Sequence, residues 1–138
     1  MSDSWVVDSS VAFAWVHPSQ ANEATNRLLD DVATGASIVV PALWFSEVSN
    51  GLLVLRRRKK LTESDRKSAL GTIAKLPVTV DEEAAKAAFG KTAELADQYG
   101  LTVYDATYLE LAIRRNLPLA SRDGALNSAA KKAGVKTW

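Results

Sequence analysis

Short apolar runs recur along this 138-residue chain, and segments with helical periodicity lie between them. Continuous runs of apolar, often β-branched residues are typical of strands that are buried on both faces, as in a parallel sheet. The runs are Trp5-Val6-Val7, Ile38-Val39-Val40, Val78-Thr79-Val80 and Leu117-Pro118-Leu119-Ala120, and Val135-Lys136-Thr137 can add a fifth strand. The alternation predicts an α/β fold with a mostly parallel central sheet of four to five strands flanked by helices.

The segments between these runs carry helix start and stop signals, with capping residues before them and glycine or proline after them. Asp8, Ser9 or Ser10 can cap the first helix. The first expected helix includes Val11 to Trp15, the second is opened by Pro18-Ser19 and ended by Gly35, and the third has Pro41 in its first turn and runs into Arg56. The fourth lies between the Thr62–Asp65 capping box and Pro77, and the fifth follows Asp81-Glu82-Glu83 and closes at Gly100. The last two span Asp105 to Arg115 and Gly124 to Ala133.

Composition excludes several classes of protein. The length fits one domain with a substantial core, and we expect a single domain over residues 1–138. The net charge is only +1, so any affinity for nucleic acid must come from a local patch. The lack of cysteine excludes disulfides, thiolate metal sites and cysteine nucleophiles. No leader and no membrane-spanning apolar stretch is recognisable, so we expect a cytoplasmic protein.

Four acidic residues stand where an ordinary core would not place them. Asp8 and Asp123 follow expected strands, Glu47 interrupts an apolar helix face, and Asp105 heads an apolar helix. Carboxylates are rarely buried unless they are paired or bound to a metal. In open α/β sheets, ligands bind beyond the carboxyl ends of the strands. We therefore expect these four side chains to share one acidic pocket at that edge.

Each of these acids also has an ordinary interpretation. Asp8 can be a helix cap, which is compatible with binding a metal, and Glu47 can extend from the edge of its apolar stripe to water. Asp105 lies at capping-box distance from Thr102, and Asp123 precedes a glycine in a turn. One shared acidic site explains the positions of all four residues more simply than four separate roles at the same edge of the sheet.

A pocket with four carboxylates needs a cation. Two carboxylates about 5 Å apart repel by roughly 3 kcal/mol at an effective dielectric of 20. Mg²⁺ or Mn²⁺ suits carboxylate, water and phosphate ligands, and such an ion activates water for hydrolysis. Ser10 stands where a haloacid-dehalogenase-type phosphatase needs a second Asp, and the receiver-domain, Walker and dinucleotide-binding patterns are absent. His17 is expected at the surface without a catalytic role.

Taken together, the motifs resemble those of a PIN domain, and more narrowly those of a VapC-type toxin of bacterial toxin–antitoxin pairs. The matching pieces are Val6-Val7-Asp8-Ser9-Ser10, Ser46-Glu47-Val48-Ser49-Asn50, Tyr104-Asp105-Ala106-Thr107-Tyr108-Leu109-Glu110-Leu111-Ala112 and Leu119-Ala120-Ser121-Arg122-Asp123. The resemblance implies a PIN-like fold and a Mg²⁺-dependent endoribonuclease, with Mn²⁺ as a substitute ion. It also implies an antitoxin partner and a homodimer.

The same resemblance assigns roles to individual residues. The catalytic and metal-binding acids would be Asp8, Glu47, Asp105 and Asp123. Ser121 stands where family members often have threonine, so its hydroxyl is expected to support the site, and Asn50 is a candidate orienting group. Glu110 is either a peripheral acid or a solvent-facing residue.

A basic run and several aromatic residues have two interpretations each. The basic run is either a solvated helix end or a contact for RNA phosphates; its members are Arg56, Arg57, Arg58, Lys59 and Lys60. Trp15, Trp44 and Phe45 are expected to be mostly core, and any exposed part can form an antitoxin groove or a dimer seam. Two alternative functions are a catalytically idle PIN-like domain that binds RNA or protein, and a DNA or structure-specific nuclease with the same site.

Overall fold

The computed structural model describes residues 4–138 and, within them, contains one sheet of four strands. The strands are β1 (Ser4–Val7), β2 (Ser37–Pro41), β3 (Val78–Asp81) and β4 (Leu119–Ala120). They pair in the order β3-β2-β1-β4, and every pair is parallel. This confirms the predicted α/β fold and the parallel sheet.

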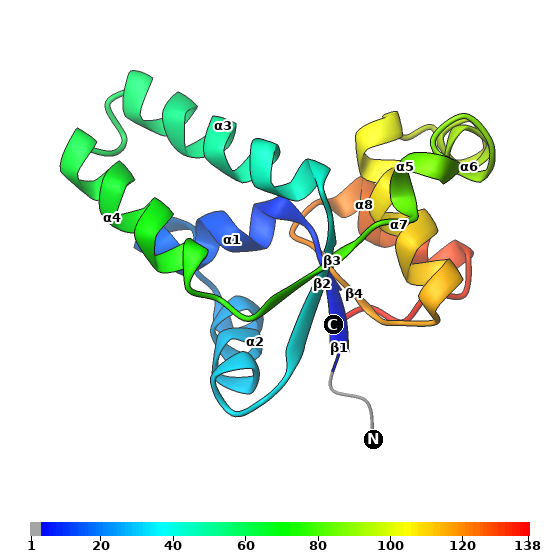
Figure 1. Cartoon of the computed structure of the whole chain (residues 1–138), viewed down its shortest axis with the longest axis horizontal. Helices are drawn as coiled ribbons and strands as arrows, with labels where there is room; N and C mark the ends of the chain where they lie inside the picture. The colour runs from blue at the N-terminus through cyan, green and yellow to red at the C-terminus, as the bar shows by residue number, and fades with distance from the viewer. Residues whose placement is uncertain (1–3) are drawn as a thin grey trace.

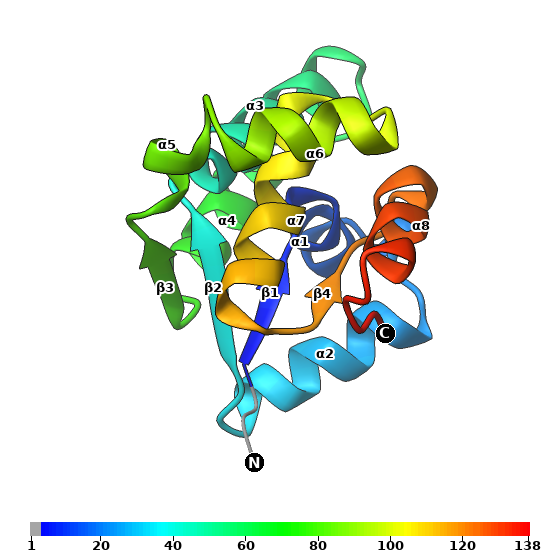
Figure 2. The same cartoon turned by 90° about the vertical axis from the view of Figure 1, so that its right-hand side faces the viewer.

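Helices cover both faces of the sheet. Figure 1 shows α1 to α4 on one side of the strands and α5 to α8 on the other, and in Figure 2 α7 crosses in front of β1 and β2. The α-helices are α1 (Ser9–Val16), α2 (Glu23–Ala33), α3 (Leu43–Arg57), α4 (Glu63–Ala74), α5 (Ala84–Ala87), α6 (Lys91–Tyr99), α7 (Val103–Arg115) and α8 (Gly124–Lys132). No described helix combines the length and the apolar character needed to cross a membrane.

The strand runs are buried because the helices cover both faces of the sheet. Val6, Val7 and Ile38 are fully buried, as expected for central parallel strands. The edge strand β3 is different, because Thr79 and Val80 are exposed. The largest fully buried side chains include Trp44 on α3 and Tyr108 on α7, two helices that also carry candidate site residues.

Two helix starts differ from the expectation. Pro18 opens only a short 3-10 turn, η1 (Pro18–Gln20), and α2 begins at Glu23. Asn22 caps α2 because its side chain accepts a hydrogen bond from the Thr25 backbone, while Thr25 accepts one from the Asn22 backbone. Pro41 is not in the first turn of α3. It ends β2 in register with Asp81, and α3 begins at Leu43.

Two further boundaries were wrong in the sequence interpretation. The single helix expected between Asp81 and Gly100 is two helices, α5 and α6, which are separated at Gly90. Gly100 does end α6, in a left-handed conformation that suits glycine. α7 begins at Val103 rather than Asp105, because Thr102 accepts a hydrogen bond from the Asp105 backbone and caps the helix.

The possible fifth strand at Val135-Lys136-Thr137 is not a strand. It makes one isolated parallel bridge between Leu119 and Thr137, and the Leu119 N–H donates to the Lys136 carbonyl at 2.8 Å. The sheet therefore has four strands among the described residues, at the lower end of the expected number.

The connections define where a ligand can bind. From β1 the chain continues to β2 and β3 on one side, whereas β4 lies on the other side of β1. Val7 and Ala120 are partners in the register, and the Asp8 N–H donates to the Ala120 carbonyl at 3.0 Å. The carboxyl ends of β1 and β4 thus form a topological switch point, the usual location of a ligand site in such sheets.

Candidate metal-dependent nuclease site

Asp8 lies at the end of β1 and is 4% exposed. Its carboxylate caps α1 by accepting from the Ser10 N–H at 3.4 Å. It also accepts from the hydroxyls of Ser10 at 3.0 Å, Ser9 at 3.3 Å and Ser121 at 2.7 Å. Hydrogen-bond donors from two loops therefore compensate the burial of this charge. The cap interpretation of Asp8 is confirmed, and it leaves a role in the acidic pocket open.

Ser121 and Asp123 lie in the loop between β4 and α8. The Ser121 hydroxyl donates to Asp8 and accepts from the Asp123 N–H at 2.9 Å. Asp123 caps α8 by accepting from the Leu126 N–H at 3.0 Å. The buried Ser121 hydroxyl therefore fastens the loop after β4 to the junction of β1 and α1, where the Arg122 N–H also donates to the Ser10 hydroxyl at 3.0 Å. Ser121 thus contacts Asp8 directly, and its role in supporting the site stays a prediction.

Glu47 lies on α3. It is half-buried between Trp44 and Val48, which are 1% and 2% exposed. Its Oε1 accepts from the buried Tyr108 hydroxyl on α7 at 2.5 Å. Burial raises the pKa of Glu47, the Tyr108 hydrogen bond opposes that shift, and the nearby Asp8 carboxylate adds to it. Burial and the Glu47 carboxylate together raise the pKa of Tyr108 far above its usual value, so the phenol remains a donor.

Asp105 completes the cluster from the first turn of α7. Its pKa is raised to about 6, first by burial and then by the charges of Asp8, Asp123 and Glu47. These three carboxylates come from the ends of β1 and β4 and from α3. The other three acids expected to share the site therefore lie within electrostatic reach of Asp105.

The donor chemistry of this pocket fits a hard divalent cation, because the available groups are carboxylate and hydroxyl oxygens. Within residues 4–138, however, no three Asp, Glu or His side chains form an arrangement that could hold a metal ion. Three of the four carboxylates accept hydrogen bonds from the protein instead: Asp8 from serines, Glu47 from Tyr108 and Asp123 from a backbone N–H.

Other predicted residues lie outside this cluster. Asn50 is exposed on α3. Glu110 is not solvent-facing, because it is 3% exposed and paired with Arg114 at 2.7 Å. Arg114 and Arg115 both also bind Asp81 at the end of β3, and chiefly the Arg114 hydrogen bond lowers the pKa of Asp81 to about 2. This network joins α7 to the edge strand and was not predicted.

Tyr108 was also missed as a functional residue, although the sequence carried a signal. It lies three residues after Asp105 in a helical segment, so both side chains share one face of α7. A tyrosine on the same helix face as a site carboxylate is a candidate partner for a second acid.

The basic run lies at the far end of α3. Arg56 is paired with Glu63 at 3.3 Å, whereas Arg57, Arg58, Lys59 and Lys60 are exposed. Arg56 follows Glu47 by nine residues, which places it about 13 Å farther along the helix axis. Figure 1 shows this end of α3 projecting away from the sheet. Contact with nucleic acid here would therefore hold a strand at some distance from the acids.

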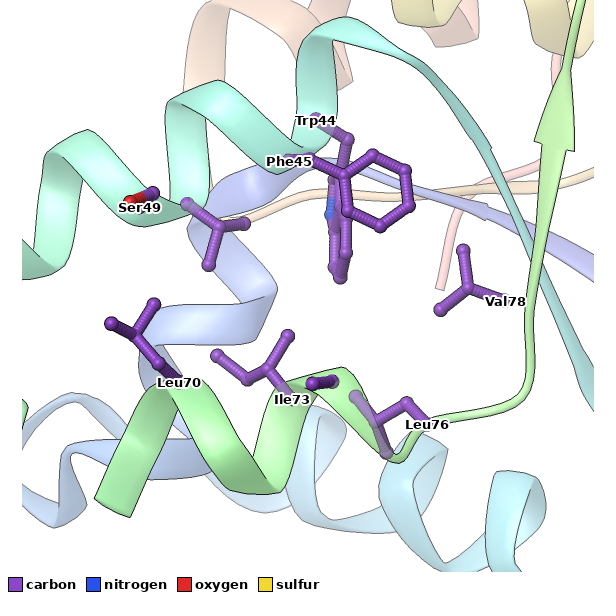
Figure 3. A pocket seen from close by; sticks show the side chains of 9 residues that line it. Trp44, Phe45, Ser49, Leu70, Ile73, Leu76 and Val78 are labelled. Carbon is purple, nitrogen blue, oxygen red and sulfur yellow. The ribbon is translucent and has the colours of Figure 1, made fainter. Parts of the chain in front are cut away.

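The aromatic residues divide between core and surface. Trp44 is buried, Trp15 is partly buried with its indole N–H donating to the Thr25 carbonyl, and Phe45 is 47% exposed. Phe45 lines an apolar groove of about 320 Å³ between α3, α4 and β3 (Figure 3). His17 caps the end of α1, and its Nε2 lies 3.0 Å from the Ser19 hydroxyl.

The chain combines a parallel α/β fold with a cluster of acids at the carboxyl edge of the sheet, and comparison with known proteins identifies its family. The PIN domain family model matches residues 5–132, so the chain belongs to the PIN domain family. PIN domains are generally nucleases. A comparison with curated proteins gave no match.

Solved structures show the same fold at low sequence identity. PAE2754 from Pyrobaculum aerophilum is 20% identical with a TM-score of 0.70, covering 97% of this chain and 83% of that one. VapBC2 from Rickettsia felis, bound to a DNA fragment from its promoter, is 12% identical with a TM-score of 0.66 and coverages of 98% and 97%. FitAcB from Neisseria gonorrhoeae is 19% identical with a TM-score of 0.66 and coverages of 97% and 96%.

Proposed function

We propose that this chain is a Mg²⁺-dependent endoribonuclease and the toxin of a VapC-type toxin–antitoxin pair. The observation that carries the proposal is the convergence of Asp8, Glu47 and Asp123 on Asp105, whose pKa they raise together with burial. The convergence lies at the carboxyl edge of the sheet of a PIN domain, a family whose members are generally nucleases.

In this proposal the four carboxylates hold Mg²⁺, with Mn²⁺ as a substitute. When bound, such a cation supplies a water of lowered pKa and shields the charge that develops on the phosphate. The chain itself supplies the arrangement of the acids. Ser10 and Ser121 fix Asp8 through their hydroxyls, while Tyr108 holds one oxygen of Glu47. The hydroxyl and phenol donors orient these carboxylates for the cation.

The proposed substrate is RNA, as the resemblance to VapC-type toxins implies. The exposed cations at the end of α3 are suited to the phosphates of a single strand that extends beyond the acids. With a net charge of only +1, the protein depends on such a local patch to attract the strand.

The proposed protein partner is an antitoxin that blocks the acidic edge, and the proposed assembly is a homodimer in the cytoplasm. The structural similarity to VapBC2, a complex solved with DNA from its own promoter, supports a pairing of this kind. Exposed Phe45 and the groove it lines offer apolar surface for protein contact.

The test is cleavage of total RNA, with single-stranded DNA of comparable length as the matched substrate. The proposal predicts RNA fragments in Mg²⁺ or Mn²⁺, none after EDTA treatment, and little cleavage of DNA. Preferential cleavage of DNA would show that the protein is a DNA nuclease and not a ribonuclease. Binding of RNA without cleavage in either metal would instead identify a catalytically idle PIN-like domain.

A further inference from the structure

The hydroxyl of Tyr108 links two helices that each carry a candidate acid. Tyr108 is fully buried on α7, and its hydroxyl donates to Oε1 of Glu47 on α3 at 2.5 Å. Within residues 4–138, no other side-chain hydrogen bond joins these two helices. We propose that Tyr108 is a positioning residue that fixes the Glu47 carboxylate for cation binding. The inference rests on the proposed function and adds a residue to its site.

The geometry explains how one hydroxyl can have this effect. A glutamate side chain has three rotatable torsions, and Glu47 is only half-buried, so packing alone does not hold its carboxylate. The Tyr108 ring is held in the core, which makes its hydroxyl a fixed donor. Because the phenol engages Oε1, one of the two carboxylate oxygens of Glu47 has a fixed position relative to α7.

The position of Tyr108 also ties Glu47 to the rest of the cluster. Asp105 lies one turn earlier on the same face of α7, so one rigid helix sets both the Asp105 carboxylate and the donor to Glu47. The charge of Glu47 adds to the effects of burial, Asp8 and Asp123 that raise the pKa of Asp105, so the two acids are close enough to interact electrostatically. A shift of α7 would therefore move both groups together.

The competing interpretation is that Tyr108 merely satisfies its own buried hydroxyl. Buried tyrosines usually find a hydrogen-bond partner, and any acceptor would serve that purpose. Only a positioning role makes cation affinity depend on the hydroxyl. Outer-shell partners of metal ligands typically contribute 10- to 100-fold to metal affinity or activity.

The test uses Tyr108→Phe, which keeps the buried ring and removes only the hydroxyl. Tyr99→Phe, on α6 and outside the acidic cluster, is the matched control. We expect Tyr108→Phe to bind Mn²⁺ roughly 10- to 100-fold more weakly by titration calorimetry, to lower kcat for RNA, and to leave KM unchanged. Glu47→Asp keeps the charge but shortens the reach to Tyr108, and the same weakening is expected.

A double variant separates positioning from packing. In a Glu47→Ala background, Tyr108→Phe should cause no further loss of Mn²⁺ affinity, because the hydroxyl acts through Glu47. Parent-like Mn²⁺ affinity in Tyr108→Phe, or full additivity in the double variant, would overturn the inference even if the melting temperature falls. If the parent cleaves RNA and Tyr108→Phe matches it in both readouts, only the positioning role fails. If the parent neither binds Mn²⁺ nor cleaves RNA, the proposed function fails as well.

Discussion

The Ser121 hydroxyl donates to Oδ2 of Asp8 at 2.7 Å, across 113 residues of sequence. Oγ of Ser121 also accepts from the Asp123 N–H at 2.9 Å, so one small side chain contacts both acids. Two acids of the proposed site thus depend on a residue that carries no charge. Their relative position is set by this hydroxyl and by the parallel pairing of the two strands.

This arrangement predicts the effect of removing the hydroxyl. Ser121→Ala should lower RNA cleavage by about 10-fold, because Asp8 loses its shortest donor and the β4 loop is released. The free energy of unfolding should fall by about 1 kcal/mol, the usual net value of one hydrogen bond. Ser121→Thr keeps the hydroxyl and should retain most activity. Equal losses in the alanine and threonine variants would show that packing, not the hydrogen bond, matters here.

Asp105 makes the metal-free protein sensitive to pH. Its pKa is raised from 3.8 to about 6 on folding, so the ionised carboxylate destabilises the folded state. The cost is absent at low pH, grows as the pH rises from about 4 to 6, and is at most about 3 kcal/mol. The melting temperature in EDTA should therefore rise as the pH is lowered from 7 to 5.

Asp105→Asn isolates that contribution. Because Thr102 rather than the Asp105 side chain caps α7, the variant should keep its helix start. We expect a higher melting temperature than the parent in EDTA at pH 7, a flatter pH dependence, and a smaller increase on adding Mn²⁺. The variant keeps Thr102 as the cap, so loss of a cap should not mask this gain. An Mn²⁺-induced shift equal to that of the parent would argue against Asp105 as a ligand.

Asp81 should have the opposite pH dependence. Its pKa is lowered to about 2 by Arg114 and Arg115, so its stabilising effect is complete above pH 4 and is lost as the pH falls through 2. Asp81→Asn should lower the free energy of unfolding at pH 7 by about 2 kcal/mol, since both arginines are partly exposed and can be rehydrated. Denaturant unfolding at pH 7 and pH 2.5 measures this. A loss of the same size at both pH values would contradict the assignment.

The basic run is tested by salt dependence. Arg57→Gln combined with Lys60→Gln removes two exposed charges outside the Arg56–Glu63 pair. If both contact phosphates, the slope of log K against log salt should flatten by roughly 0.7 per contact. Lys131→Gln with Lys132→Gln, at the end of α8, removes the same charge elsewhere and should leave the slope unchanged. Identical slopes in both double variants would show that the basic run is only a solvated helix end and makes no contact with phosphates.

Local signals explain how much of the site could be predicted. Asp8 and Asp123 could be placed because Asp8 directly follows β1 and Asp123 lies in the loop after β4, and parallel strands end at one edge of the sheet. Glu47 could be recognised because it interrupts an otherwise apolar helix face. These features depend on neighbouring residues, so a single sequence displays them.

Contacts between distant segments could not be predicted in this way. The Ser121–Asp8 and Tyr108–Glu47 hydrogen bonds span 113 and 61 residues, and no local pattern specifies either partner. The Asp81–Arg114 pair likewise depends on how α7 packs against the edge strand. Helix starts at Pro18 and Pro41 were misplaced because proline suits a 3-10 turn or a strand end as well as a first helical turn.

The most direct measurement of the central claim is RNA cleavage by Asp8→Asn in Mg²⁺, with Asp97→Asn on α6 as the matched control. Asparagine caps helices as well as aspartate does, so the variant should fold, and only one negative charge is removed. The account predicts a loss of at least about 100-fold in kcat for Asp8→Asn and parent-like activity for Asp97→Asn. Parent-like cleavage by Asp8→Asn, in preparations free of host ribonuclease, would contradict it.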